Sequence, residues 1–263
     1  MAYPSLNYAK LGEVGVVTFA TPARLNAISA QRLDDLEAVL TDAEADPHLR
    51  ALVLTGEGDR AFCVGLDLDL LDICFADLAR FQAVVTRVAA IIARIEALPI
   101  PTLAAINGLA RAGGFEFALG CDFIMVADEA RFGDAHTDSG VLPAAVTTRL
   151  KRKIGDQRAK ALIWSARYLS GAEAVEYGLA LRSVPRARLL EESLAFLATL
   201  IDKPRATLAA SKAVLQQTAD LSLDDAVALE LRSFQAYMAG EPYGREGYTA
   251  FREKRPPSWK VLP

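Results

Sequence analysis

Short apolar runs alternate with longer stretches of mixed character along much of the chain. Each run is too short for an amphipathic helix, is rich in Val, Ile, Leu or Ala, and ends near a glycine, a proline or a charged residue. These runs predict buried β-strands at residues 14–20, 51–55, 102–106, 123–127 and 179–184. Because helical stretches separate the strands, the pattern predicts an α/β fold of repeated strand–strand–helix units.

The intervening stretches carry helix signals. Ser29 is placed to cap a helix over residues 29–45, whose apolar residues form one stripe. A long helix is predicted over residues 76–98, where Pro99 and Pro101 end it.

Beyond about residue 185 the strand pattern stops and only helical stretches remain. Helices are predicted at residues 187–201, 204–218 and 223–239. The first of them is apolar over much of its circumference, which predicts burial on more than one side. The pattern therefore divides the chain into a strand–strand–helix core over residues 1–190 and a helical C-terminal region over residues 191–263.

Composition and charge exclude several classes of function. The chain has 263 residues, 52% of them hydrophobic, which is enough for a large core. Its net charge of −4 comes from interleaved acidic and basic residues, so no nucleic-acid surface is expected. No run approaches the roughly 18 apolar residues of a membrane span, and Met1 to Gly12 lacks the order of a signal peptide. A cytoplasmic location and no membrane partner are therefore expected.

The cysteines do not predict a metal site. Cys63, Cys74 and Cys121 are scattered, with no pair at metal-ligand spacing, and their odd number favours a reducing compartment. Cys63 lies beside a glycine loop, but no histidine is near it in sequence. It therefore fits a buried packing residue better than a nucleophile. The absence of a Gly-x-Ser-x-Gly elbow weighs against a serine hydrolase.

The most informative motif is the glycine-containing turn between Asn107 and Glu116. A predicted strand precedes it, and Phe115 begins a helical stretch. This order leaves unpaired backbone N–H groups at a helix N-terminus, where a developing anion is stabilised. The adjacent Gly113 and Gly114 let a substrate oxygen approach the backbone, and Glu116 is placed one turn later to exchange protons with that substrate. The alternative is a buried strand–helix corner whose glycines serve packing alone.

A second glycine loop follows the predicted strand at residues 51–55. Gly56-x-Gly58-x-x-Ala61 matches the dinucleotide-binding fingerprint in its glycine/alanine form. That fingerprint opens a helix directly, whereas residues 62–65 continue as turn and loop. A chance match is therefore the better interpretation.

Further motifs follow these two loops in a fixed order. Together they are Ala61 to Leu68, Ile106 to Gly108, Gly113 to Glu116, Cys121-Asp122, Ala130 to Gly133, Gly140 to Pro143, Leu169 to Ala174, Tyr177 to Leu179 and Phe251 to Arg255. Ordered in this way over nearly the whole chain, they resemble the crotonase (enoyl-CoA hydratase/isomerase) superfamily. The resemblance implies a crotonase-type spiral of repeated ββα units, with a helical C-terminal region for oligomerisation and for covering coenzyme A.

The resemblance implies that the two loops activate an acyl-CoA thioester. An enolate oxygen needs two N–H donors, which by resemblance are the backbone groups of Leu66 and Gly113. Leu66→Ala should then be mild, whereas Leu66→Pro would delete one donor. Coenzyme A is part of the substrate, and no further cofactor is implied.

The acid–base residues depart from the hydratase pattern. Hydratases of the family use two glutamates, one at Glu116 and one in the segment 134–138, where His136 occupies the second position. A glutamate and a histidine still exchange protons, since an imidazole titrates near neutrality. Asp134 and Asp138 are close by but out of register with the second glutamate. The alternative for His136 is a structural or surface residue.

Several reactions fit such a site. An enolate-stabilising site suits a lyase of the hydratase type, an isomerase, a decarboxylase or an enzyme that hydrolyses a carbon–carbon bond. A protein of another class, which binds acyl-CoA but has lost hydratase activity, also fits. Intact loops and Glu116 favour catalysis, whereas His136 and Asp69 favour loss of it.

The coenzyme A contacts are likewise taken from the resemblance. The loop residues that hold it, mostly through the backbone, are Cys63, Val64, Leu66, Asp67 and Leu68. Asp69 stands where the family often has a basic residue near the CoA phosphates, so we expect weaker CoA binding or a different acyl carrier. Phe251 and Lys254 match positions that reach a neighbouring subunit's adenine and phosphate, although Lys254 also fits a solvated charge run. The resemblance implies a homotrimer, or a hexamer made of two trimers.

Overall fold

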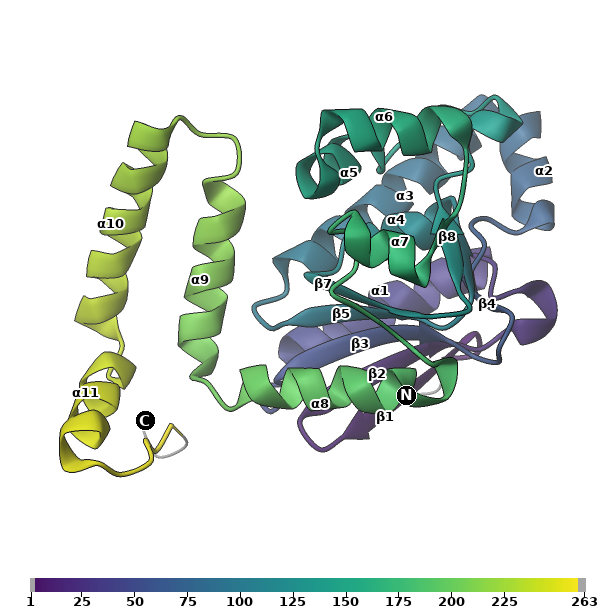
Figure 1. Cartoon of the computed structure of the whole chain (residues 1–263). Coiled ribbons are helices and arrows are strands. Elements are labelled where there is room, and N and C mark those ends of the chain that lie inside the picture. The colour runs from purple at the N-terminus through teal and green to yellow at the C-terminus, as the bar shows by residue number, and fades with distance from the viewer. Residues whose placement is uncertain (1–2, 260–263) are drawn as a thin grey trace. The chain divides into compact units, whose positions relative to one another are not determined.

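The computed structural model describes residues 3–259, which form two compact units that divide between Phe196 and Leu197. Every strand of the described residues lies in the larger unit, and the smaller unit is helical (Figure 1).

A six-stranded sheet runs through the larger unit. Its strands are β1 (Leu6–Leu11), β2 (Val14–Phe19), β3 (Ala51–Gly56), β5 (Thr102–Ile106), β7 (Phe123–Ala127) and β10 (Arg182–Val184), in the order β1-β2-β3-β5-β7-β10. β1 pairs antiparallel with β2, and the other pairings are parallel. The strands β3, β5 and β7 are almost wholly buried. Their continuous apolar runs are typical of parallel strands that are covered on both faces.

A smaller four-stranded sheet takes the second strand of each repeat. Its strands, in spatial order, are β4 (Ala61–Cys63), β6 (Leu109–Arg111), β8 (Arg131–Gly133) and β9 (Leu169–Ser170). β4, β6 and β8 are parallel, and β9 is antiparallel to β8. The pairs β3–β4, β5–β6 and β7–β8 thus each place one strand in each sheet before a helical segment follows. This repeated ββα arrangement confirms the predicted fold.

Helices connect the strand pairs. In the larger unit they are α1 (Ala30–Ala45), α2 (Leu68–Ala76), α3 (Leu78–Ala97), α4 (Gly113–Leu119), α5 (Thr147–Ile154), α6 (Asp156–Ser165) and α7 (Gly171–Glu176), with short 3-10 turns η1 (Pro22–Arg24), η2 (Thr137–Ser139) and η3 (Arg186–Arg188). The predicted cap of α1 is confirmed, because the Ser29 hydroxyl accepts a hydrogen bond from the amide of Arg32 at 3.2 Å. Phe19 of β2, Phe62 of β4 and Phe117 of α4 pack together in the core between the sheets.

Two predicted elements differ from the structure. The helix predicted over residues 76–98 is α3, but a separate helix, α2, precedes it; Asp77 ends α2 and caps α3 by accepting from the amides of Ala79 and Arg80. Of the strand predicted over residues 179–184, only Arg182–Val184 forms a strand, which is β10. The amides of Leu179 and Ala180 donate instead to the carbonyl of Ala174 in α7, so they do not join the sheet.

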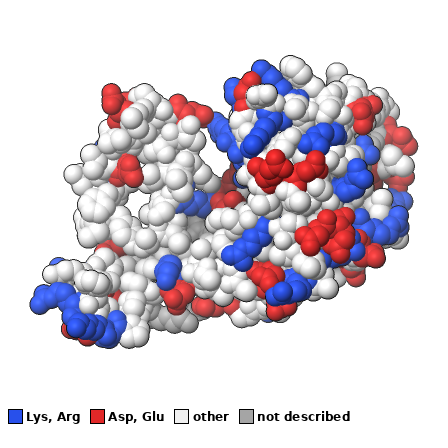
Figure 2. Space-filling view, viewed as in Figure 1, with Lys and Arg blue, Asp and Glu red and all other residues white. Residues whose placement is uncertain are grey.

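After β10 the regular structure of the described chain is helical as far as Glu253, in agreement with the predicted helical C-terminal region. The helices are α8 (Leu189–Ile201), α9 (Arg205–Gln217), α10 (Leu223–Gly240) and α11 (Tyr243–Glu253). The last of these was not predicted. Within residues 3–259, no helix is long and apolar enough to cross a membrane. On the face of the larger unit seen in Figure 2, acidic and basic side chains interleave.

The glycine loop at residues 56–61 connects two strands. β3 ends at Gly56, a bend follows, and β4 begins at Ala61. A Cβ built on Gly56 would lie 2.4 Å from the carbonyl oxygen of Ala61, so this glycine serves a close backbone contact. Because no helix opens here, the rejection of a dinucleotide fingerprint is confirmed.

Candidate active site

Two loops that are distant in sequence meet at the ends of neighbouring strands. β4 and β6 are parallel neighbours, so the residues that follow each strand lie together. A Cβ built on Gly65 would lie 3.0 Å from the Cβ of Ala112 and 3.1 Å from the backbone nitrogen of Gly113. Gly65 also has a φ of +90°, which residues with side chains rarely adopt. A glycine at this position therefore allows the two loops to touch.

The backbone N–H groups of Leu66 and Gly113, the two predicted donors, lie on these adjoining loops. On either side of Leu66 the chain pairs with Ile28, which donates to the carbonyl of Gly65 at 2.8 Å and accepts from the amide of Asp67 at 3.0 Å. Gly113 is the first residue of α4, so its N–H has no acceptor within the helix. Within the described chain neither N–H has a backbone acceptor.

The turn before α4 has an unusual conformation. Ala112 has φ 46° and ψ −123°, a region that glycine favours and that alanine adopts only under strain. Its amide donates to the carbonyl of Asp134 at 2.9 Å, which ties the turn to the end of β8. The carbonyl of Ala112 accepts from the amide of Glu116 at 2.9 Å, so the peptide that carries the Gly113 N–H is also fixed to the first turn of α4.

Glu116 lies one turn into α4, which is buried along its whole length. The side chain is 5% exposed, and its Oε1 accepts a hydrogen bond from the amide of Ala145 at 3.1 Å. Burial raises the pKa of Glu116, while the nearby His136 opposes that effect by favouring the carboxylate. A Cβ built on Gly113 would lie 3.9 Å from Oε2, so the second carboxylate oxygen lies beside the loop with the free N–H.

His136 lies on the turn after β8, where Asp134 is its partner. The ring nitrogen Nδ1 lies 2.6 Å from Oδ1 of Asp134, whose side chain is fully buried. Burial by itself would lower the pKa of His136, but the hydrogen bond and charge of Asp134, with the charge of Glu116, raise it overall. Asp134 therefore orients the ring and favours its protonated form, and Nε2 remains for other contacts.

A cavity of about 1220 Å³ brings these groups together. Leu66, Gly113, Glu116 and His136 all line it. An apolar wall comes from α2 and α3 and consists of Leu71, Phe75, Leu78, Phe81, Val85 and Val88. The cavity therefore combines hydrogen-bond donors, an acid–base pair and a large apolar surface, which is typical of a small-molecule site.

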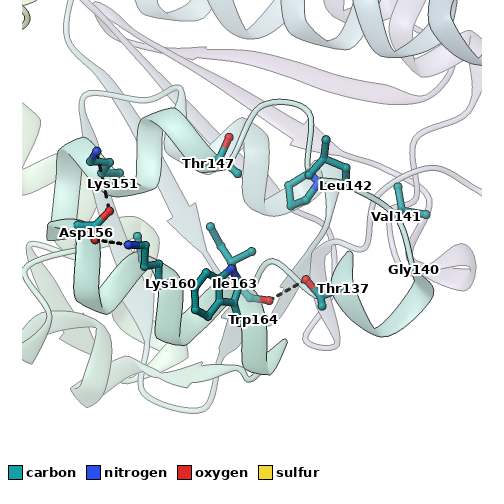
Figure 3. Close-up of a pocket in the computed structure, with 12 residues that line it drawn as sticks. Thr137, Gly140, Val141, Leu142, Thr147, Lys151, Asp156, Lys160, Ile163 and Trp164 are labelled. Carbon is teal, nitrogen blue, oxygen red and sulfur yellow. Dashed lines mark hydrogen bonds and ion pairs between the residues drawn. The ribbon is translucent and has the colours of Figure 1, made fainter.

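A second cavity of about 540 Å³ lies beside the turn that carries His136. Its lining comes from the segment around Val141 and from α5 and α6, as Figure 3 shows. The hydroxyl of Thr137 donates to the carbonyl of Ile163 at 2.8 Å and anchors the turn to α6. Since neither Glu116 nor His136 lines this cavity, it carries none of the chemistry described above.

The predicted coenzyme A residues fall into different places. Val64, Leu66, Asp67 and Leu68 line the large cavity. Cys63 is fully buried and does not line it, and burial raises the pKa of its thiol to about 11, which fits a packing residue and not a nucleophile. Phe251 and Lys254 lie in and directly after α11 of the smaller unit.

Two partners in this region were missed from the sequence. Arg24 approaches Asp69 at 2.8 Å and Asp67 at 3.3 Å, so the charge of Asp69 is offset by a residue far away in sequence. The sequence offers Asp134 only as a substitute for a glutamate, whereas the structure makes it the partner of His136. The Asp-x-His spacing is the sequence signal that could have identified this pair.

Comparisons with known proteins agree with this architecture. The sequence profile of the Enoyl-CoA hydratase/isomerase family matches residues 10–261. A Mycobacterium tuberculosis protein named "Probable enoyl-CoA hydratase" is 33% identical over 98% of this chain and 99% of its own length. A crotonyl-CoA hydratase of Syntrophomonas wolfei is 32% identical over 97% of each chain. The crystal structure of an enoyl-CoA hydratase from Bacillus anthracis is 30% identical, covers 98% of this chain and 100% of its own, and superposes with a TM-score of 0.92.

Proposed function

This chain belongs to the enoyl-CoA hydratase/isomerase family, and from that premise we propose that it is an enzyme that activates an acyl-CoA thioester as an enolate. The observation that carries the proposal is that two free N–H groups, Glu116 and His136 all border one cavity. Hydration of an enoyl thioester is the preferred reaction, because the relatives are named enoyl-CoA and crotonyl-CoA hydratases.

The thioester oxygen is assigned to the N–H groups of Leu66 and Gly113. Donors fixed before the reaction stabilise a developing oxyanion strongly, because they need no reorganisation when the charge appears. The contact at Gly65 and the constrained turn at Ala112 supply that fixed geometry. The N-terminal end of α4 adds a favourable partial charge.

Glu116 and His136 are assigned the proton transfers. One of them takes a proton from water as the hydroxyl oxygen attacks the β-carbon, and the other gives a proton to the α-carbon. The net change is one water added across the double bond, and a proton exchange restores both groups. The buried Asp134 positions the imidazole and does not itself contact the substrate.

A protein that only binds acyl-CoA is the alternative. Such a protein needs no buried carboxylate with a raised pKa beside an imidazole that is hydrogen-bonded to a buried aspartate. Buried ionisable groups of this kind are costly to maintain and cluster at catalytic sites. Isomerisation, decarboxylation and carbon–carbon bond hydrolysis use the same enolate and remain as further reactions of the site.

Mass spectrometry of a panel of acyl-CoA thioesters tests the reaction, and two variants test the residues. Glu116→Gln and His136→Ala are each expected to lower kcat by about 100-fold or more, with little change in thioester binding. Asp138→Asn is the matched control, because Asp138 is an exposed carboxylate of the same segment. Full activity in His136→Ala would make the histidine structural and leave Glu116 to act alone.

The remaining assignments follow from the same proposal. The assigned chemistry uses only side chains and backbone N–H groups, so it needs no cofactor beyond the coenzyme A of the substrate. We expect a homotrimer or a hexamer, since apolar side chains are exposed along α10 at Leu223, Val227, Leu231, Phe234 and Met238. Phe251 and Lys254 are proposed to contact coenzyme A in such an assembly. The free, buried cysteines support a reducing compartment such as the cytoplasm.

A further inference from the structure

Arg111 is a charged side chain in the large cavity that the proposed reaction does not use. It ends β6, in which Ala110 is fully buried while Leu109 and Arg111 are partly exposed. Because side chains alternate between the faces of a strand, Leu109 and Arg111 share one face. Both line the large cavity, together with Glu116 and His136.

The guanidinium of Arg111 has no carboxylate partner among residues 3–259. Its charged neighbour is His136, whose pKa it lowers by repulsion. Two other arginines near the site are neutralised: Arg149 is bound by both oxygens of Glu96, and Arg24 by Asp67 and Asp69. Arg60 also lines the cavity but is exposed to solvent. A partly buried guanidinium beside an imidazole is an arrangement that an anion would stabilise.

The position of Arg111 limits where that anion lies. β6 and β8 are neighbours, with Arg111 opposite Gly133, so the arginine lies next to the segment that carries His136. Arg111 also precedes Gly113 by two residues, which span at most about 7 Å of chain. The anion therefore belongs on the side of the cavity that carries His136, in the same cavity as the reacting carbons.

We propose that the acyl group of the substrate carries a second, free carboxylate, and that Arg111 binds it. The substrates are then monothioesters of short dicarboxylic acids. A guanidinium fits this task because its planar donors match both oxygens of a carboxylate. The inference rests on the proposed function for the identity of the thioester, and it makes Arg111 the residue that determines acyl specificity.

Matched thioesters of coenzyme A test the proposal. Glutaryl-CoA and pentanoyl-CoA have equally long acyl chains and differ only in the terminal carboxylate, and their binding can be measured by calorimetry without turnover. Glutaryl-CoA is expected to bind about 10- to 100-fold more tightly, the range of a charge-assisted hydrogen bond. Arg111→Gln should abolish that difference without weakening pentanoyl-CoA, and Arg111→Lys should retain part of it. Arg131→Gln is the control, since Arg131 is exposed on the neighbouring strand and stacks on Tyr168 outside the cavity.

Two results would overturn the proposal. They are equal binding of the two thioesters and an equal loss of both in Arg111→Gln. An equal loss would mean that Arg111 holds the coenzyme A portion. Turnover of the unsaturated thioesters glutaconyl-CoA and 2-pentenoyl-CoA tests the proposed hydration separately from the carboxylate site. If glutaryl-CoA binds preferentially but neither unsaturated thioester is turned over, the proposed reaction is contradicted and the carboxylate site is supported.

Discussion

Substituting Gly114 tests whether the close contact between the two loops positions the proposed oxyanion donors. A Cβ built on Gly114 would lie 1.9 Å from the carbonyl oxygen of Cys63 and 2.6 Å from its carbonyl carbon, whereas real Cβ contacts closer than 3.0 Å essentially do not occur. Both partners are backbone atoms, so no side-chain rotation relieves the overlap. In Gly114→Ala, the end of β4 and the start of α4 must therefore separate by at least about 1 Å.

That separation changes both activity and stability. Leu66 follows Cys63 and Gly113 precedes Gly114, so the movement changes the spacing of the two N–H groups. A misplacement of about 1 Å is expected to lower kcat on the order of 100-fold. Overpacking at a backbone contact costs about 3 kcal/mol of unfolding free energy, which corresponds to a Tm lower by about 6–12 °C.

Steady-state kinetics on the best enoyl thioester and a thermal melt measure the two effects. Gly240→Ala is the matched control, because a Cβ built on Gly240 meets no atom within 4 Å. This control should keep the wild-type kcat and Tm. If Gly114→Ala melts lower but turns over at the wild-type rate, the loop contact does not position the donors, and the assignment of the oxyanion hole fails.

Three further predictions concern the same site. Asp134 raises the pKa of His136, so Asp134→Asn should move the pH–rate limb of the histidine to lower pH and reduce kcat by about 100-fold; an unmoved limb contradicts the pairing. Burial raises the pKa of Glu116, so its contribution to stability is present at low pH and is lost as pH rises through that pKa. Glu116→Gln should therefore melt higher than the wild type at pH 8, with the difference shrinking toward pH 4, and a lower Tm at pH 8 would refute this. Ala112→Gly relieves strain of about 1–3 kcal/mol at an entropic cost of about 1 kcal/mol, so its Tm should be unchanged or higher, and a clear drop in the melt would argue against strain.

The sequence by itself determined the features that depend on local order. The apolar runs identified the strands β2, β3, β5 and β7, because a buried parallel strand needs a continuous apolar segment. The spacing of Gly113 and Glu116 placed a carboxylate one turn from a helix start, because helical periodicity is fixed by backbone geometry. The order of motifs identified the family, which the comparisons confirmed.

Only the tertiary structure decided which distant groups meet. Each repeat divides its two strands between two sheets, and sequence periodicity does not encode this division. The division brings Gly65 beside Gly113, and it brings Arg111 beside the segment that carries His136. The ion pair of Arg24 with Asp69 joins segments 45 residues apart, so no local pattern predicts it. The Asp77 cap that separates α2 from α3 is, by contrast, a local signal that the sequence carried and the apolar pattern alone did not use. Long-range pairing, burial and charge neutralisation depend on packing, and packing is a property of the whole fold.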